Sequence, residues 1–98
     1  MTGKGSYLRR MPSDAEIKRL HWRAHHRGTK EADLLIGGFF DAHSASWGNE
    51  EREKFEAMLE EQDVDIMAWA HGIAEAPKRF EGPIIEALKQ LDYIRIAR

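Results

Sequence analysis

The sequence predicts an all-α fold, a small bundle of five helices, and three observations support it. In five segments, apolar residues recur at the three- and four-residue spacing of amphipathic helices. No segment alternates apolar and polar residues over the length of a strand, and no Asn-Gly or Asp-Gly pair indicates a hairpin. The connections between the segments are short, which favours antiparallel packing around one core.

The first helix is predicted to start at Ser13. In the stretch SDAE, Ser13 is the N-cap and Glu16 lies three residues later, which is the pattern of a capping box. Gly28 follows the last periodic residue, and glycine readily adopts the left-handed conformation that ends a helix. The inward stripe of this helix is predicted to contain Ile17, Leu20, His21 and Ala24.

Thr29 is a suitable cap for the second helix, which runs to about residue 43. Gly37 and Gly38 lie inside it, and each costs about 1 kcal/mol of helix stability relative to alanine. That cost indicates that another backbone approaches closely there. The predicted apolar stripe contains Leu35, Ile36, Phe39 and His43, broadened by Leu34 and Phe40.

The C-terminal half is predicted to contain three more helices. Asn49 caps a third helix over 50–62, Asp63 caps a short fourth helix that Gly72 ends, and Pro83 starts the last helix. We expect Trp69 in the core and Trp47 at its edge. The other predicted inward residues are Phe55, Met58, Leu59, Gln62, Ile66, Met67, Ala70, Ile84, Ile85, Leu88 and Leu91.

Length and composition indicate one small domain that acts on a larger partner. The chain has 98 residues and no cysteine, so the sequence supports neither a disulfide framework nor a thiol nucleophile. We expect a disordered basic tail over 1–12 and a single helical domain over 13–98. The sequence contains no apolar stretch long enough to cross a membrane and no signal-peptide pattern. These features predict a cytoplasmic protein that is monomeric when free.

Charge is distributed unevenly, which raises the alternative of nucleic-acid binding. Residues 1–30 are basic by six charges, and residues 31–98 are acidic by eight. The basic candidates are Arg9, Arg10, Lys18, Arg19, Arg23, Arg27 and Lys30. However, the second helix of a helix-turn-helix pair would read the bases, and here it is apolar and acidic, which would repel phosphates.

Residue patterns typical of enzymes are absent from the sequence. No serine lies in a G-x-S-x-G setting, and no glycine-rich loop follows a strand, so the sequence predicts neither a catalytic residue nor a dinucleotide or other cofactor site. His21 and His25 are four residues apart and share a helix face, as two metal ligands would. No H-E-x-x-H motif or evident third ligand accompanies them, so we predict no metal site.

The corner between the first two helices has unexplained charges. Arg27 and Glu31 flank Gly28 and lie four residues apart. They can pair with each other, or they can present a guanidinium and a carboxylate to a partner. Trp22 lies off the inward stripe, and a large aromatic side chain on a polar helix face often marks a protein contact.

The stretch RLHWRAHHRGTKEADLLIGGFFDAH resembles the succinate dehydrogenase assembly factor family, which includes bacterial SdhE and mitochondrial assembly factor 2. The hallmark of that family is R-G-x-x-E, here Arg27, Gly28 and Glu31. The similarity continues through FEAMLEEQDVDIMAWAHG and covers roughly residues 14 to 95. Trp22 departs from the family's pattern, in which we expect another aromatic residue such as Tyr or Phe.

The resemblance implies a five-helix bundle that has no enzyme activity and no cofactor of its own. It implies binding to the flavoprotein subunit of succinate dehydrogenase or fumarate reductase, where the factor promotes covalent attachment of FAD to a histidine. Arg27, Gly28 and Glu31 would contact that partner. We add Asp33, His26 and Trp22, which we expect near the same surface. A regulatory, antitoxin-like binder with another client remains an alternative, and a nucleic-acid-binding domain is a further one.

Overall fold

The computed structural model describes residues 13–94, and within that range the chain is all-α, as predicted. Five α-helices follow in order: α2 (Asp14–His25), α3 (Lys30–His43), α4 (Asn49–Met58), α5 (Asp63–Ala70) and α6 (Pro83–Gln90). Short 3-10 turns lie at η1 (Ser44–Ser46) and η2 (Lys78–Phe80). The predicted tail over 1–12 and the last four residues lie outside the described residues. No helix in the described part is long and apolar enough to cross a membrane.

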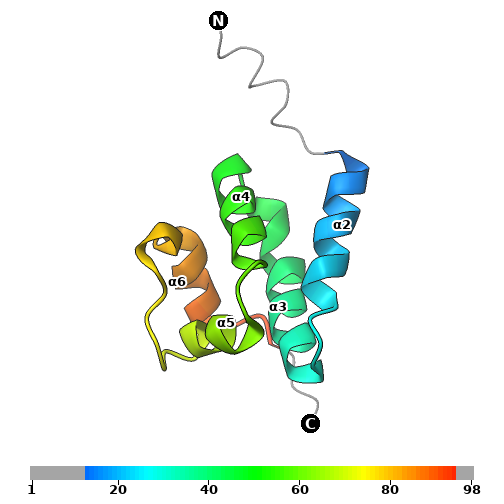
Figure 1. Cartoon of the computed structure of the whole chain (residues 1–98). Helices are drawn as coiled ribbons and strands as arrows, with labels where there is room; N and C mark the ends of the chain where they lie inside the picture. The colour runs from blue at the N-terminus through cyan, green and yellow to red at the C-terminus, as the bar shows by residue number, and fades with distance from the viewer. Residues whose placement is uncertain (1–12, 95–98) are drawn as a thin grey trace, which may run out of the picture.

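Helices α2 and α3 form an antiparallel hairpin, and the remaining helices pack on the other side of α3 (Figure 1). Helix α4 runs back alongside α3, α5 crosses near the start of α3, and α6 lies farthest from α2. The corner that joins α2 to α3 is therefore at the same end of the molecule as α5. This arrangement lets residues that are far apart in sequence meet at the corner.

The predicted caps of the first two helices are confirmed. Ser13 Oγ accepts a hydrogen bond from the Glu16 N–H at 3.1 Å, and the Glu16 carboxylate accepts one from the Ser13 N–H at 3.1 Å. At α3, Thr29 Oγ1 accepts from the Ala32 N–H at 3.1 Å. These bonds satisfy backbone donors that helix starts otherwise leave without a partner.

The predicted caps of α4 and α5 are wrong by one residue. Gly48 is the N-cap of α4, and Asn49 is its first helical residue, with an amide oxygen that accepts from Arg52. The Gly48 N–H instead donates to the Glu51 carboxylate at 3.1 Å. Gln62 is the N-cap of α5. Asp63 is instead the first helical residue, and its carboxylate accepts a hydrogen bond from an arginine of the α2–α3 corner.

The core is formed by aromatic and aliphatic side chains from all five helices. Predicted core residues such as Phe39, Phe55 and Trp69 are buried, and Trp47 packs at the edge. Phe80 and Tyr93, which we did not predict, are also buried because η2 and the segment after α6 fold back onto the core. Four residues predicted to face inward are exposed: Ile17, His21, Leu34 and Gln62.

The two glycines of α3 make room for neighbouring groups. A Cβ on Gly38 would lie 3.2 Å from the Tyr93 carbonyl oxygen, which confirms the predicted approach of another backbone. A Cβ on Gly37 would lie 2.4 Å from Nδ1 of His25, so the group packed there is a side chain of α2. The glycines therefore let α3 contact the α2 histidine at one position and the C-terminal segment at the next.

Tyr93 fixes the C-terminal segment after α6. Its hydroxyl donates to the Leu88 carbonyl at 2.6 Å, and its ring packs edge-on against Phe39 with centroids 5.1 Å apart. Burial, together with the negative charge of Asp92, raises the pKa of the Tyr93 hydroxyl above its ordinary value. The folded chain therefore holds this proton more tightly than the unfolded chain does.

We predict that alkaline pH weakens the fold through Tyr93. Above about pH 10 the unfolded chain loses the Tyr93 proton while the folded chain keeps it, so stability falls by up to about 1.4 kcal/mol per pH unit. Below about pH 10 both states keep the Tyr93 proton, so the stabilisation that Tyr93 provides is fully present. Urea unfolding of Tyr93→Phe should show a loss of about 1 kcal/mol at neutral pH, from the missing hydrogen bond, and a shallower decline above pH 10. Parallel declines in the two proteins would contradict this assignment.

Candidate functional site

The corner between α2 and α3 is shaped by Gly28. Its φ is +119°, a backbone conformation that side chains with a Cβ rarely adopt. Among the described residues other than its two chain neighbours, no atom lies within 4 Å of the position that a Cβ on Gly28 would occupy. Gly28 is therefore required by the backbone turn rather than by packing inside the chain. The corner is exposed at Gly28 and Thr29, so another molecule can approach it closely.

Arg27 joins this corner to the start of α5. Its Nε donates to Asp63 Oδ1 at 2.8 Å, and its Nη2 donates to the Glu61 carbonyl at 3.2 Å. The side chain is only 11% exposed. Of the two alternatives for Arg27 and Glu31, the pairing with each other is not what the structure has, because the Arg27 guanidinium is bonded to Asp63 and to the Glu61 carbonyl. The sequence could not reveal Asp63 as the partner of Arg27, because Asp63 lies 36 residues away. Its position in the sequence indicated only a helix cap.

Asp33 closes the corner from the α3 side. Its carboxylate accepts a hydrogen bond from the Arg27 backbone N–H at 2.5 Å. The prediction that Asp33 lies near the corner is thus confirmed. Because Arg27 is held both through its side chain and through its backbone, the corner has a fixed conformation before any partner arrives.

Glu31 is an acidic group that the corner leaves without a partner among the described residues, and the neighbouring Lys30 likewise has none there. The Glu31 side chain is exposed in the first turn of α3 and makes no hydrogen bond or ion pair with any residue between 13 and 94. Helix spacing places it on one stripe with Leu34, Gly38 and Asp41. Leu34 is 60% exposed, against the prediction that it faces the core. The first turns of α3 therefore expose a carboxylate and a leucine side chain next to each other.

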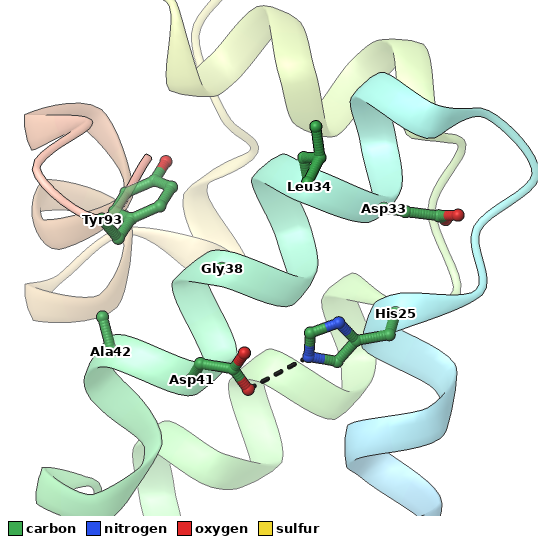
Figure 2. A pocket seen from close by; sticks show the side chains of 7 residues that line it. All are labelled: His25, Asp33, Leu34, Gly38, Asp41, Ala42 and Tyr93. Atoms are coloured by element: carbon green, nitrogen blue, oxygen red, sulfur yellow. Dashed lines mark hydrogen bonds and ion pairs between the residues drawn. The ribbon is translucent and has the colours of Figure 1, made fainter. Parts of the chain in front are cut away.

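A groove of about 330 Å³ continues this stripe along α3. Figure 2 shows Tyr93 and the His25 ring on opposite sides of Gly38, with the Asp41 carboxylate directed toward His25. The groove is lined by His25, Asp33, Leu34, Gly38, Asp41, Ala42 and Tyr93. The candidate site therefore consists of a rigid corner and an adjoining groove, with acidic and apolar groups along it.

Trp22 and His26 lie together on the outer face of α2. Their rings stack with centroids 4.2 Å apart and an interplanar angle of 11°, and His26 Nδ1 is 2.7 Å from the Trp22 carbonyl oxygen. Trp22 is 59% exposed, in agreement with its predicted position off the inward stripe. The pair is a flat aromatic surface that precedes the corner by only a few residues.

His21 and His25 meet a third side chain that the sequence did not reveal. Asp41 of α3 brings Oδ1 to 3.0 Å from Nε2 of His25 and to 3.6 Å from Nε2 of His21. Figure 2 shows the His25 ring pointing across to Asp41. We predicted no metal site because the sequence shows no evident third ligand. Asp41 could not be recognised as one from the sequence pattern, since it lies on a different helix from the two histidines.

The basic residues that suggested nucleic-acid binding are partly neutralised within the chain. Arg23 Nη2 lies 2.5 Å from a Glu60 carboxylate oxygen, and Arg23 Nη1 lies 3.9 Å from Glu56. Arg27 is paired with Asp63, as described above. These acids of α4, the α4–α5 turn and α5 lie beside the two arginines and would repel phosphates, so the described part of the chain does not favour an electrostatic nucleic-acid surface.

Comparison with known proteins finds relatives over most of the chain. A family model described as flavinator of succinate dehydrogenase matches residues 18–92. The FAD assembly factor SdhE of Acetobacter pasteurianus is 36% identical over 81 residues, which cover 83% of this chain and 74% of that protein.

Mitochondrial proteins match as well, but over a smaller share of their length. The mitochondrial succinate dehydrogenase assembly factor 2 of Candida glabrata is 36% identical over 80% of this chain and 52% of its own length. The corresponding protein of Yarrowia lipolytica is 32% identical over 81% of this chain and 57% of its own length. This chain thus spans little more than half of these mitochondrial relatives. No solved structure matches.

We predict that the Arg27–Asp63 pair stabilises the fold more than an exposed pair does. Arg27→Gln should lower the free energy of unfolding by about 1.5–3 kcal/mol, because it leaves a partly buried carboxylate without its charged donor. The matched control is Arg79→Gln, which removes the exposed pair between Arg79 and Glu61 and should cost less than about 1 kcal/mol. Urea unfolding measures both.

A double-mutant cycle tests whether the effect belongs to this pair. Arg27→Gln combined with Asp63→Asn should cost clearly less than the sum of the two single changes, by at least about 0.5 kcal/mol. Strict additivity, or an Arg27 variant no less stable than the Arg79 control, would show that the cross-link contributes little to the fold.

Proposed function

This chain belongs to the family of flavinators of succinate dehydrogenase, and we propose that it binds the flavoprotein subunit of that enzyme and promotes covalent attachment of FAD. The flavoprotein subunit of fumarate reductase is a second client of the same chemistry. In this proposal the protein holds its client and contributes no catalytic residue and no cofactor of its own.

One observation carries the proposal beyond the family: Glu31 is exposed and has no partner among residues 13–94, on a corner where Arg27, Thr29 and Asp33 are hydrogen-bonded within the chain. A carboxylate held on a rigid backbone loses little conformational entropy on binding. It can accept charge-assisted hydrogen bonds from an arginine or lysine of the client. Gly28 lets the client approach this corner because no side chain covers it.

Arg27 and Asp33 are assigned a positioning role in this proposal. Their polar groups are directed at each other and at α5, so they fix the direction in which Glu31 points. Leu34 and the groove behind it would provide apolar contact. Trp22 and His26 lie close enough in sequence to the corner to extend the same surface along α2.

Binding alone can promote flavin attachment if it orders the client. The reaction joins a histidine of the client to the flavin, so both reacting groups belong to the complex of client and cofactor. Fixing two such groups in a reactive orientation can lower a barrier by about 7–11 kcal/mol in favourable cases. A small helical protein without a deep catalytic pocket is sufficient for this task.

We predict that Glu31→Gln weakens binding to the flavoprotein subunit about tenfold, which corresponds to about 1.4 kcal/mol and the loss of one charge-assisted contact. The matched control is Glu50→Gln, since Glu50 is also exposed, occupies the same position in the first turn of α4, and has no partner among the described residues. Titration of each variant against the purified subunit measures the affinity.

The flavin content of the client provides the functional measurement. The subunit, FAD and each variant are incubated together, and covalent flavin is read as fluorescence of the subunit band on a denaturing gel. Glu31→Gln should slow the appearance of this band at limiting concentration, and Glu50→Gln should not. Equal affinities and rates for the two variants would contradict the assignment of Glu31, and a band that forms equally fast without the protein would contradict the proposed function.

A further inference from the structure

We propose that His21, His25 and Asp41 form a binding site for a divalent transition-metal ion between α2 and α3. The site takes an ion of the class that prefers imidazole and carboxylate ligands, such as Zn²⁺. This inference goes beyond the proposed role in flavin attachment and does not depend on it, because the three side chains belong to this chain alone and the ion needs no client.

The three ligand atoms are close enough to share one ion. Asp41 Oδ1 lies 3.0 Å from Nε2 of His25 and 3.6 Å from Nε2 of His21, and all three side chains offer ligand atoms within 4.8 Å of one another. In a tetrahedral site with bonds of about 2.0–2.1 Å, ligand atoms are about 3.4 Å apart. Small side-chain movements would therefore bring all three atoms to coordinating distance.

The backbone sets the histidines in this arrangement. His21 and His25 are one turn apart on α2, and their rings lie 4.2 Å apart with an interplanar angle of 31°. Gly37 allows the His25 ring to lie against α3, since a Cβ there would be 2.4 Å from Nδ1 of the ring. Asp41 follows Gly37 by one turn of α3, so its carboxylate faces the same gap.

The chemistry of the cluster selects the class of ion. Two imidazoles and one carboxylate suit Zn²⁺, Co²⁺ or Ni²⁺, whereas Ca²⁺ and Mg²⁺ prefer oxygen ligands throughout. The side chains of His21 and Asp41 are 55% and 52% exposed, and that of His25 is 27% exposed. An ion can therefore enter from solvent, and water can fill the remaining coordination positions.

A bound ion would fasten the α2–α3 hairpin next to the corner. His25 is the last residue of α2, two residues before Arg27. Coordination would join α2 to α3 at this end, where the Arg27 contacts already join the corner to α5. Because the three ligands are brought together only in the folded chain, an ion that binds there would stabilise the fold.

The test uses the full chain without a histidine tag, stripped of metal and kept at about pH 7.5, where an ordinary histidine is neutral. Titration with Co²⁺ should give visible d–d absorption bands that saturate at one ion per chain and disappear when Zn²⁺ is added. A Zn²⁺ concentration about a hundredfold above the dissociation constant should raise the midpoint of thermal unfolding by at least about 5 °C.

Variants assign the ion to these residues. His21→Gln and Asp41→Asn should each weaken Co²⁺ binding at least about tenfold, as loss of a ligand or its supporting group does in metal sites. Gly37→Ala should also weaken binding, because it displaces the His25 ring without removing a ligand. His71→Gln is the matched control, since His71 is exposed and lies outside the cluster, and it should bind Co²⁺ like the unaltered chain.

Two results would overturn the proposal. The first is the absence of Co²⁺ bands at millimolar concentration, which would leave the cluster as histidine–aspartate ion pairs only. The second is binding that His21→Gln and Asp41→Asn leave unchanged, or that His71→Gln weakens equally, which would place the ion elsewhere on the surface. Circular dichroism of each variant confirms that the helices are retained, so that a loss of binding reports on the site.

Discussion

The hydrogen bonds of Arg27 are the interaction on which the candidate site depends. The guanidinium joins the α2–α3 corner to Asp63 and to the Glu61 carbonyl at the start of α5, and its backbone N–H is held by Asp33. A corner built on a glycine with positive φ would otherwise be free to adopt several conformations. The cross-link selects one of them, and that conformation determines where Glu31 points. In the proposed function, the arginine of the R-G-x-x-E motif positions the corner and the glutamate contacts the client.

Helix α3 has a second role, because it carries a different set of contacts on each side. One side carries buried aromatic residues such as Phe39 and Phe40. The other side carries the groove and, at Asp41, the contact with the α2 histidines. The helix tolerates two adjacent glycines because these contacts offset the roughly 1 kcal/mol that each costs.

Sequence patterns correctly predicted several features that depend on interactions between residues close together in the chain. The capping box at Ser13, the Thr29 cap, the turn at Gly28 and the proline at the start of α6 all depend on neighbours within four residues. The family resemblance likewise rested on contiguous motifs, and the comparisons confirm the family.

Contacts between distant segments could not be predicted in the same way. The partner of Arg27 lies 36 residues away, and Asp41 reaches the histidines only because α2 and α3 are antiparallel neighbours. Leu34 fits an inward stripe by its apolar character, yet it lies on the exposed edge of α3. Tyr93 follows the last helix and is buried only because the chain turns back. Each of these features depends on the tertiary arrangement, which periodicity does not encode.

In the proposed function, the corner and the first turns of α3 form the surface that binds the flavoprotein subunit. Hydrogen–deuterium exchange of this chain, measured with and without the purified subunit, tests it most directly. We expect slower exchange in peptides that span residues 25–35 when the subunit is present, and unchanged exchange in peptides that span α4. Protection confined to α4 or α6, with the corner exchanging as fast as in the free chain, would show that the subunit binds elsewhere and not at this corner.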